Sequence, residues 1–258
     1  MSVIYINPYF RGPWTPAQIT TAMWLDASDA STVTTVSGAV SQWNDKSGNA
    51  RNATQTTAAN RPAYTTAGLN SLNVITFDGS NDHLVHSFSA SPAPHSIYAV
   101  TRRLTGGNGN YFVLVSCISA SSAFGAVMHA KIEGSANWGS YINSWTSADY
   151  SLLDTWRIVG IVSPTSTSGT ESYRTDGTLV GKSYASRYAG DGTNRRAIGG
   201  DPGFNTGFFS GNAGEIIVTT SALSTPDCEK MEGYLAHKWA LTGNLPAGHP
   251  YKTAAPTV

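Results

Sequence analysis

Residues 211–218 read Gly-Asn-Ala-Gly-Glu-Ile-Ile-Val, and residues 232–239 read Glu-Gly-Tyr-Leu-Ala-His-Lys-Trp. The first stretch ends in three β-branched residues, which is typical of a buried strand. The second belongs to a repeat at intervals of three and four residues, as in a helix: Met231, Tyr234, Leu235, Lys238 and Trp239. A single short amphipathic helix after an apolar strand indicates a sandwich architecture.

The sequence also predicts where this helix begins and ends. Ser224-Thr225-Pro226-Asp227 offers a hydroxyl cap, a proline in the first turn and an early carboxylate, which are the usual signals of a helix start. Gly243 is the expected C-cap. We expect His237 and His249 to pin the helix and the final turn.

Outward from the helix, short strand patterns alternate with turns of Gly, Asn, Asp and Ser. Residues 156–162 are almost continuously apolar, which favours a central strand. Asp176-Gly177 predicts a tight hairpin. The expected strands are 23–26, 40–44, 72–77, 96–102, 111–117, 124–130, 156–162, 171–174, 178–182, 197–199 and 214–219.

The chain of 258 residues shows no internal linker, so one domain is expected over residues 14–258. Residues 1–13 form an aromatic, proline-containing arm that is the candidate anchor to a partner, through Tyr5, Tyr9 and Phe10. Residues 15–19 predict a helical turn with Pro16 at its first position.

Composition narrows the function classes. Basic and acidic residues number 16 each, so the chain lacks the basic excess of a nucleic-acid surface. No apolar run is long enough to span a membrane, and the N-terminus does not read as a secretory signal. Cys117 and Cys228 are expected to be buried thiols rather than a disulfide framework.

Three linked motifs carry a family resemblance: Trp24-Leu25-Asp26-Ala27, the stretch 43–49 (Trp-Asn-Asp-Lys-Ser-Gly-Asn) and the stretch 77–82 (Phe-Asp-Gly-Ser-Asn-Asp). Together with residues 215–218 and 234–239, they resemble the laminin-G-like branch of the concanavalin A-like lectin/glucanase superfamily, over residues 20–252. The resemblance implies an all-β fold: a two-sheet antiparallel jelly-roll sandwich with one short helix near the C-terminus.

Relatives in that superfamily occur on bacterial surfaces and in tailed-bacteriophage particles. The resemblance and the missing export signal lead us to expect a non-enzymatic structural or decoration protein of a phage virion, on capsid or tail. Its expected partners are other virion proteins, further copies of itself in an oligomer or array, and host-surface glycan. A bacterial carbohydrate-binding module and a divergent glycoside hydrolase are the alternatives.

Catalytic patterns are absent from the sequence. Retaining glycosidases need two carboxylates close together on one strand face. Among Glu133, Glu171, Glu215, Glu229 and Glu232, none forms such a pair, and Glu229 and Glu232 are expected on a solvated helix face. His83 and His86 would point to opposite faces of a strand, so a zinc site is not favoured.

Two weaker site predictions remain. Asp78, Asn81 and Asp82 form an oxygen-rich turn, and the resemblance implies a structural calcium ion there, although the pattern is also ordinary turn chemistry. Sugar rings stack on aromatic faces, and one polar stretch contains a group of such residues. The candidate glycan-binding residues are Asn137, Trp138, Tyr141, Asn143, Trp145 and Tyr150, with sandwich ends or subunit contacts as the alternative.

Overall fold

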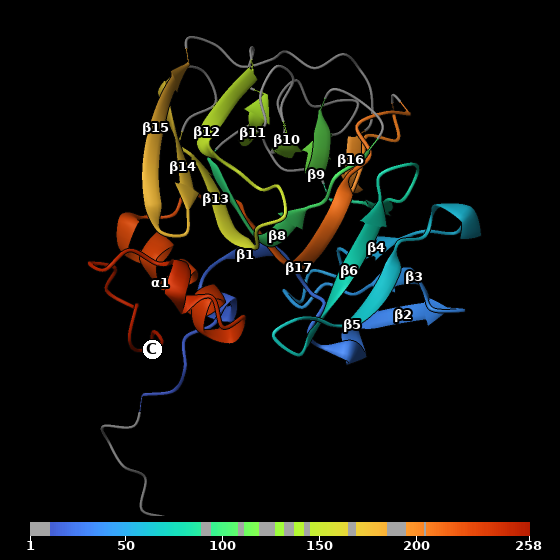
Figure 1. The fold of residues 1–258 in the computed structure, drawn as a ribbon. Coiled ribbons are helices and arrows are strands. Elements are labelled where there is room, and N and C mark those ends of the chain that lie inside the picture. Colours follow the sequence, from blue (N-terminus) through green and yellow to red (C-terminus); the bar gives the residue numbers. More distant parts are fainter. Residues whose placement is uncertain are drawn as a thin grey trace, which may run out of the picture.

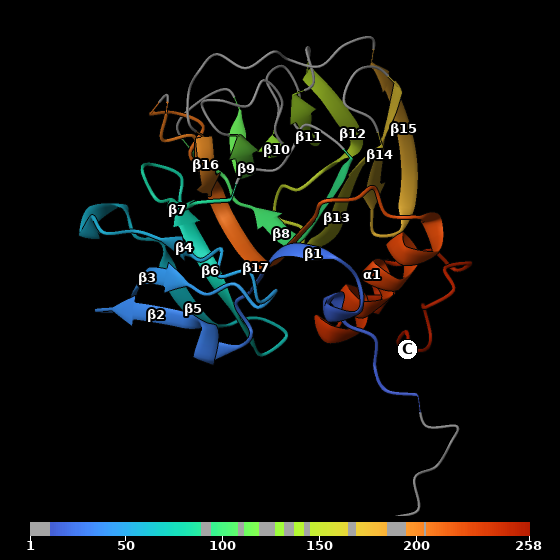
Figure 2. The same cartoon turned by 180° about the vertical axis from the view of Figure 1, so that it is seen from behind.

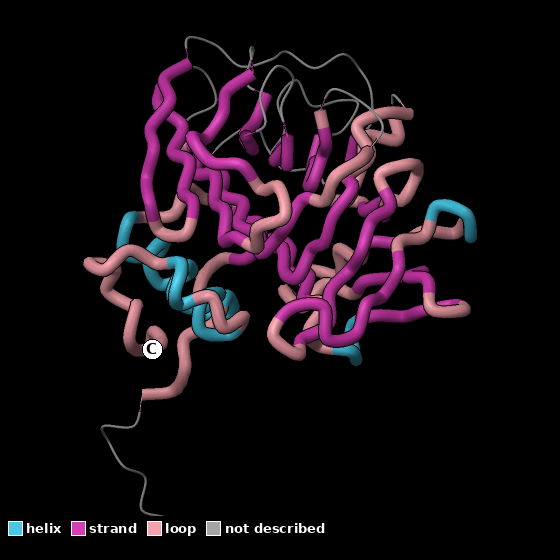
Figure 3. The backbone as a smooth tube through the Cα atoms, viewed as in Figure 1, coloured by secondary structure: helices cyan, strands magenta, loops and turns pink. Residues whose placement is uncertain are grey.

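The computed structural model describes residues 11–88, 94–107, 111–118, 127–131, 137–141, 145–164, 169–184, 195–203 and 205–258. Strands are the main secondary structure of the described chain (Figure 3). It is an antiparallel β-sandwich with one α-helix in the described part (Figure 1), which confirms the predicted fold class.

The first eight strands are β1 (Thr21–Asp26), β2 (Val33–Val36), β3 (Ala39–Trp43), β4 (Ala53–Thr54), β5 (Ala63–Leu69), β6 (Leu72–Asp78), β7 (Leu84–His86) and β8 (His95–Arg103). The remaining ones are β9 (Phe112–Ile118), β10 (Val127–Lys131), β11 (Asn137–Tyr141), β12 (Trp145–Ser151), β13 (Arg157–Ser163), β14 (Gly169–Thr175), β15 (Thr178–Tyr184), β16 (Arg195–Ile198) and β17 (Ser210–Thr219). The helices are α1 (Thr225–Lys238) and the 3₁₀ turns η1 (Pro16–Gln18), η2 (Ala30–Thr32), η3 (Ala58–Asn60) and η4 (Thr242–Asn244).

The strands form two layers that are joined through β3. One layer runs β15–β14–β13–β8–β17, and β17 then pairs with β6 along its first half and with β1 along its second half. The other runs β12–β11–β10–β9–β16–β7–β4. Strand β13 has a partner on both sides, so residues 156–162 were correctly predicted as central.

A third layer explains why several strands are apolar on both faces. In β8, Ile97 and Ala99 pack between the two sheet layers, whereas Tyr98 and Val100 face the helix side. Helix α1 covers this outer face beside β13, β14 and β1 (Figure 2). Both faces are buried, and a strand buried on both faces reads as a continuous apolar run.

Helix α1 begins as predicted: the Ser224 side chain accepts a hydrogen bond from the backbone N–H of Asp227. The prediction for its end was wrong. The C-cap is Trp239, followed by Ala240 at φ 52°, whereas Gly243 lies inside η4. The helix stops early because the chain turns back after Trp239, whose ring is fully buried under the sheet.

The start and the end of the described chain lie side by side. Pro13 and Thr257 form an antiparallel bridge, the N–H of Trp14 donates to Pro256 O, and the N–H of Val258 donates to Gly12 O. Residues 1–10 lie outside the described residues, so the predicted anchor side chains Tyr5, Tyr9 and Phe10 are not placed. No helix in the described chain has the length and apolarity needed to cross a bilayer.

Candidate functional site

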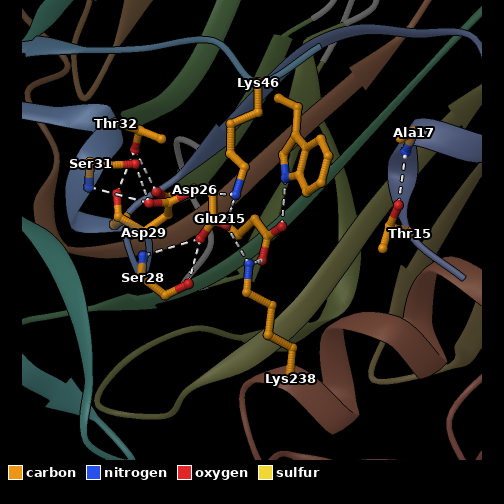
Figure 4. Close-up of polar contacts among 12 residues, drawn as sticks. Thr15, Ala17, Asp26, Ser28, Asp29, Ser31, Thr32, Lys46, Glu215 and Lys238 are labelled. Carbon is orange, nitrogen blue, oxygen red and sulfur yellow. Dashed lines mark hydrogen bonds and ion pairs between the residues drawn. The ribbon is translucent and has the colours of Figure 1, made fainter. Parts of the chain in front are cut away.

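Four charged side chains converge beneath helix α1, and we call them the Glu215 centre: Asp26, Lys46, Glu215 and Lys238 (Figure 4). Asp26 ends β1 and pairs in register with Glu215 of β17. Lys238 comes from the last turn of α1, and Lys46 from the turn after β3. The two lysines reach the carboxylates from opposite sides.

A β-bulge places Glu215. The register between β17 and β8 shifts between Ala213 and Glu215, so Gly214 is the extra residue. A Cβ atom at Gly214 would come within 2.8 Å of the Trp239 ring, so the glycine lets that ring pass close to the strand. The sequence signal for this centre was a lone glutamate inside an apolar strand.

Both oxygens of Glu215 are fully engaged by protein donors. Oε1 accepts from Trp24 Nε1 at 2.7 Å and from Tyr234 Oη at 2.9 Å. Oε2 accepts from Trp239 Nε1 at 2.7 Å and from Lys238 Nζ at 2.7 Å. Burial raises the pKa of Glu215 above its ordinary value, although the charge of Lys238 opposes this.

Asp26 is engaged in the same way. Its Oδ1 accepts from the backbone N–H and the hydroxyl of Ser28, at 3.1 and 2.6 Å, and its Oδ2 contacts Lys46 at 2.9 Å and Lys238 at 2.7 Å. Burial raises the pKa of Asp26, but the charge of Lys238 and the hydrogen bonds from Lys238, Ser28 and Lys46 together hold it below its ordinary value. The hydrogen bond from Lys46 lowers the pKa of Asp29 to about 2.

A second ionic cluster holds the other flank of the helix. Glu232 receives two hydrogen bonds from Arg174, at 2.5 and 3.1 Å, and lies 3.1 Å from His249 Nε2. Because Glu232 is buried, the prediction of a solvated face was wrong for this residue, while Glu229 is half-buried. The structural prediction for the histidines is confirmed, since His249 contacts Glu232 and His237 Nε2 contacts Tyr251 O at 2.9 Å.

A third buried carboxylate, Glu171, lies within the sandwich on β14. Its Oε2 accepts from the hydroxyls of Ser140 and Tyr173, each at 2.6 Å, and its Oε1 accepts from Ser163. No local pattern in the sequence indicates this cluster, because its donors come from β11, β13 and β14 and meet only after the layers fold together.

The predicted calcium turn is an Asx turn in the described structure. Asp78 Oδ1 accepts backbone N–H groups of Ser80, Asn81 and Asp82 at 2.8 to 3.4 Å, and Asp82 Oδ2 accepts from Asp78 N at 3.0 Å. Burial and the nearby charge of Asp78 raise the pKa of Asp82 to about 6.

The two carboxylates that meet at this turn carry four oxygens, two of which already accept backbone N–H groups, whereas calcium takes roughly six to eight oxygens. Over the described part of the chain, no three His, Cys, Asp or Glu side chains gather to hold a metal ion. The donor set does not form a calcium cage by itself, and calcium binding stays a prediction that rests on Asp78, Asn81 and Asp82.

The glycan candidates are dispersed. The Trp138 ring is buried, its Nε1 donates to Thr175 Oγ1 at 3.0 Å, and it packs edge-on against Tyr173, so it has no open face for a sugar. Tyr150 is half-buried against the core, beneath the guanidinium of Arg157 at 5.3 Å. Asn137 begins β11 and is half-buried.

Two other glycan candidates are brought together by the strands. Tyr141 of β11 and Trp145 of β12 are direct partners in the ladder at the end of this hairpin. Asn143, between them in sequence, lies outside the described residues.

His86 and the two cysteines are buried in the described structure. His86 Nε2 lies 3.0 Å from Ser116 O, and burial lowers the pKa of His86 to about 4. Both cysteines are buried and free, as predicted. Burial also raises the pKa of Cys117 to about 12, which makes it a poor nucleophile.

No family model matches the chain, and no curated protein matches it in sequence. Its fold is similar to a Trypanosoma rangeli sialidase in complex with sialic acid, with 12% identity, a TM-score of 0.54, and 89% of this chain and 36% of the sialidase covered.

It is also similar to an arabinofuranosidase complexed with arabinofuranosyl-alpha-1,2-xylobiose, with 14% identity, a TM-score of 0.50, and 86% of this chain and 58% of the other covered. The binding domain of botulinum neurotoxin serotype G gives 12% identity, a TM-score of 0.50, and coverage of 86% and 51%. The chain spans between 36% and 58% of the length of these three proteins. At these identities the likeness shows a shared β-sandwich fold alone.

Proposed function

We propose that this chain is a non-enzymatic structural or attachment protein, displayed on the capsid or tail of a tailed-bacteriophage particle, with weak affinity for host-surface glycans. The β-sandwich fold supports a role in binding or as a structural component of an assembly. The virion assignment rests on the sequence resemblance described above. Other virion proteins and further copies of this chain are the proposed partners.

One observation carries the non-enzymatic part of the proposal: the buried carboxylates are used to hold the fold together. Glu215, Asp26, Glu232 and Glu171 each accept hydrogen bonds at both oxygens from protein donors. A general acid or base must reach the proton it transfers, through a direct contact or one water. Buried carboxylates that are engaged at both oxygens by the protein's own groups are poorly placed to reach the proton of a bound substrate.

A carbohydrate-binding module is the second candidate, and the paired positions of Tyr141 and Trp145 favour it. Aromatic residues at a hairpin end suit a shallow sugar subsite. Binding of a defined glycan at micromolar to millimolar concentration, weakened by Trp145→Ala and kept in the matched control Leu179→Ala, would support it. Leu179 suits that control because it is exposed on β15, in a different hairpin.

A divergent glycoside hydrolase is the third candidate. Asp82, whose pKa is raised to about 6 beside Asp78, is the candidate general acid for such a reaction. Asp78 Oδ1 accepts three backbone N–H groups of its own turn, so one of the two oxygens of this second carboxylate is already used in holding the turn.

Immunogold electron microscopy tests the virion assignment. Particles from a lysate of the source are labelled with an antibody against this chain. We expect gold on heads, which would indicate capsid decoration, or on tails, which would indicate a tail role. Particles without gold, from a lysate in which the chain is detected by immunoblot, would overturn the assignment and leave the carbohydrate-binding module as the leading candidate.

A further inference from the structure

Lys238 occupies an unusual position between two carboxylates. Its Nζ lies 2.7 Å from Asp26 Oδ2 and 2.7 Å from Glu215 Oε2 (Figure 4). The three residues come from α1, β1 and β17, so three separate elements bring an amine, a carboxyl group and a second carboxyl group together. The side chains of Asp26 and Glu215 are 3% and 0% exposed, so little water reaches their carboxyl groups.

The walls of this site are aromatic. The indole N–H groups of Trp24 and Trp239 and the hydroxyl of Tyr234 hold Glu215 in place, and the rings of Tyr234 and Trp239 lie 5.5 and 5.7 Å from Lys238 Nζ. Burial disfavours charged groups here, and the contacts with Lys238 and Lys46 offset that cost for Asp26. An amide between Lys238 and Asp26 would remove both charges and release one water from a site that is largely shielded from solvent.

We propose that Lys238 and Asp26 are joined by an intramolecular amide bond, formed after folding with Glu215 as the proton carrier. The site would thus be a self-modification site that cross-links the first strand of the sandwich to its last helix.

The reaction balances without any further reagent. Lys238 passes a proton from its ammonium group to Glu215, and the freed Nζ attacks Cγ of Asp26. The Nζ–Cγ bond forms, the Cγ–Oδ2 bond breaks, and Oδ2 leaves as water after taking up protons from Nζ through Glu215. The ammonium and carboxylate become one amide and one water, with no change in oxidation state.

The geometry selects these residues among the neighbouring charges. Lys46 also contacts Asp26 Oδ2, at 2.9 Å, but it bonds Asp29, whose side chain is 35% exposed, and it has no described contact with Glu215. Lys238 touches both the carboxyl group to be attacked and the carrier. Burial raises the pKa of Glu215, which suits a group that must hold and return a proton.

The closeness of the Lys238 amine to the Asp26 carboxyl group favours their reaction. Well-oriented intramolecular reactions reach effective concentrations of about 10⁵–10⁸ M. The bond would join residues 26 and 238 and so enclose nearly the whole sandwich in one covalent loop. A cross-link between such distant residues restricts the unfolded chain strongly, and it suits a protein that we propose to be held on a particle surface.

Intact-mass spectrometry of the purified full chain under denaturing conditions tests the proposal. We expect a mass lower than the sequence mass by one water, and a tryptic digest that contains the Asp26 peptide joined to the Lys238 peptide. The full sequence mass in folded wild-type protein would overturn the proposal. A water loss mapped to any other pair, or to an aspartate cyclised with its own backbone, would overturn it as well.

Single substitutions test the separate roles of Lys238 as the amine and Glu215 as the proton carrier. Lys238→Met and Glu215→Gln are expected to restore the full mass, because the first removes the amine and the second removes the proton carrier. Lys230→Met removes another lysine of the same helix and is expected to keep the water loss. Circular dichroism checks that each variant is folded; the wild-type peptide map remains decisive even if Glu215→Gln fails to fold. Retention of the linked peptide in folded Glu215→Gln would exclude Glu215 as the carrier.

Discussion

At the scale of single residues, several buried carboxylates of this sandwich have partners from distant parts of the chain. Glu215 meets Trp24 and Trp239, and Glu232 meets Arg174. Removing one member of such a set leaves a buried group without its partner, which costs more than the net value of the contact. Glu215 and Glu232 therefore act mainly by holding neighbouring strands and the helix in fixed relative positions.

Asp82 is the exception, and its titration gives a pH prediction. Its pKa in the folded state is about 6, above the ordinary value of 3.8, so the folded protein binds more protons than the unfolded one between these values. The contribution of Asp82 to the free energy of unfolding is therefore fully present below about pH 4 and is lost as the pH rises through 6.

Asp82→Asn should accordingly stabilise the protein at pH 7 by about 1–2 kcal/mol and have little effect at pH 4. The measurement is the urea midpoint of both proteins from pH 4 to 8 in the presence of a chelator. Parallel curves for wild type and variant would show that Asp82 does not titrate in this way.

The same pair gives the calcium test. If Asp78 and Asp82 bind calcium, its addition at pH 7 should raise the melting temperature of the wild type and leave that of Asp82→Asn unchanged. An unchanged wild-type melting temperature at saturating calcium would count against a calcium site at this turn.

Gly214 gives a steric prediction. A Cβ atom there would lie 2.8 Å from the Trp239 ring, which is fully buried and held by its Nε1 bond to Glu215. Gly214→Ala should destabilise the protein by about 1–3 kcal/mol. Gly243→Ala is the matched control, because a Cβ atom at Gly243 would meet no heavy atom within 4 Å, and it should change the urea midpoint little. Equal effects of the two substitutions would contradict this packing.

At the scale of elements, helix α1 is held by an apolar stripe with an ionic cluster on each flank. Met231 and Leu235 are fully buried against the sheet, while Lys238 contacts the Glu215 centre and Glu232 contacts Arg174. This arrangement fixes the rotation and the axial position of the helix together.

Arg174→Met tests the second flank. It leaves the buried Glu232 with the His249 ring as its remaining described side-chain partner and should destabilise the protein by about 3–5 kcal/mol. The double variant Arg174→Met/Glu232→Leu should recover part of that loss, because no charge then stays buried. Glu229→Gln, on the same helix but without an ion pair in the described chain, is the control. Additive effects in the double variant would contradict the coupling.

The strands and the helix could be predicted where their patterns are local. The apolar run of 156–162, the Asp176-Gly177 turn and the cap at Ser224 all appear as expected. Strand β5 and the β11–β12 hairpin were not predicted, because their polar alternation resembles loop composition. The site could not be predicted, since Asp26, Glu215 and Lys238 are far apart in sequence and meet only through the pairing of β1 with β17.

At the scale of the whole molecule, the two ends of the described chain lie together, joined by the bridge between Pro13 and Thr257. Residues 11–13, the described part of the predicted arm, therefore lie beside the C-terminal residues (Figure 1). This position suits an anchor that holds the sandwich by one end.

Deletion of residues 1–10 tests the anchor. The bridge at Pro13 is kept, so the variant should fold with an unchanged melting temperature while its attachment to particles falls at least about tenfold, equivalent to about 1.4 kcal/mol of binding free energy. Occupancy on particles would be measured by quantitative immunoblot after purification. Attachment at the wild-type level would show that the arm is not the anchor.

An activity assay tests most directly whether the sandwich attaches rather than catalyses. Wild-type protein is incubated with a broad polysaccharide and glycoside panel, and released sugars are detected by mass spectrometry. We predict no release above the buffer control. Release of a sugar by the wild type that is abolished by one conservative carboxylate substitution, such as Asp82→Asn or Glu171→Gln in folded protein, would contradict a purely attaching role.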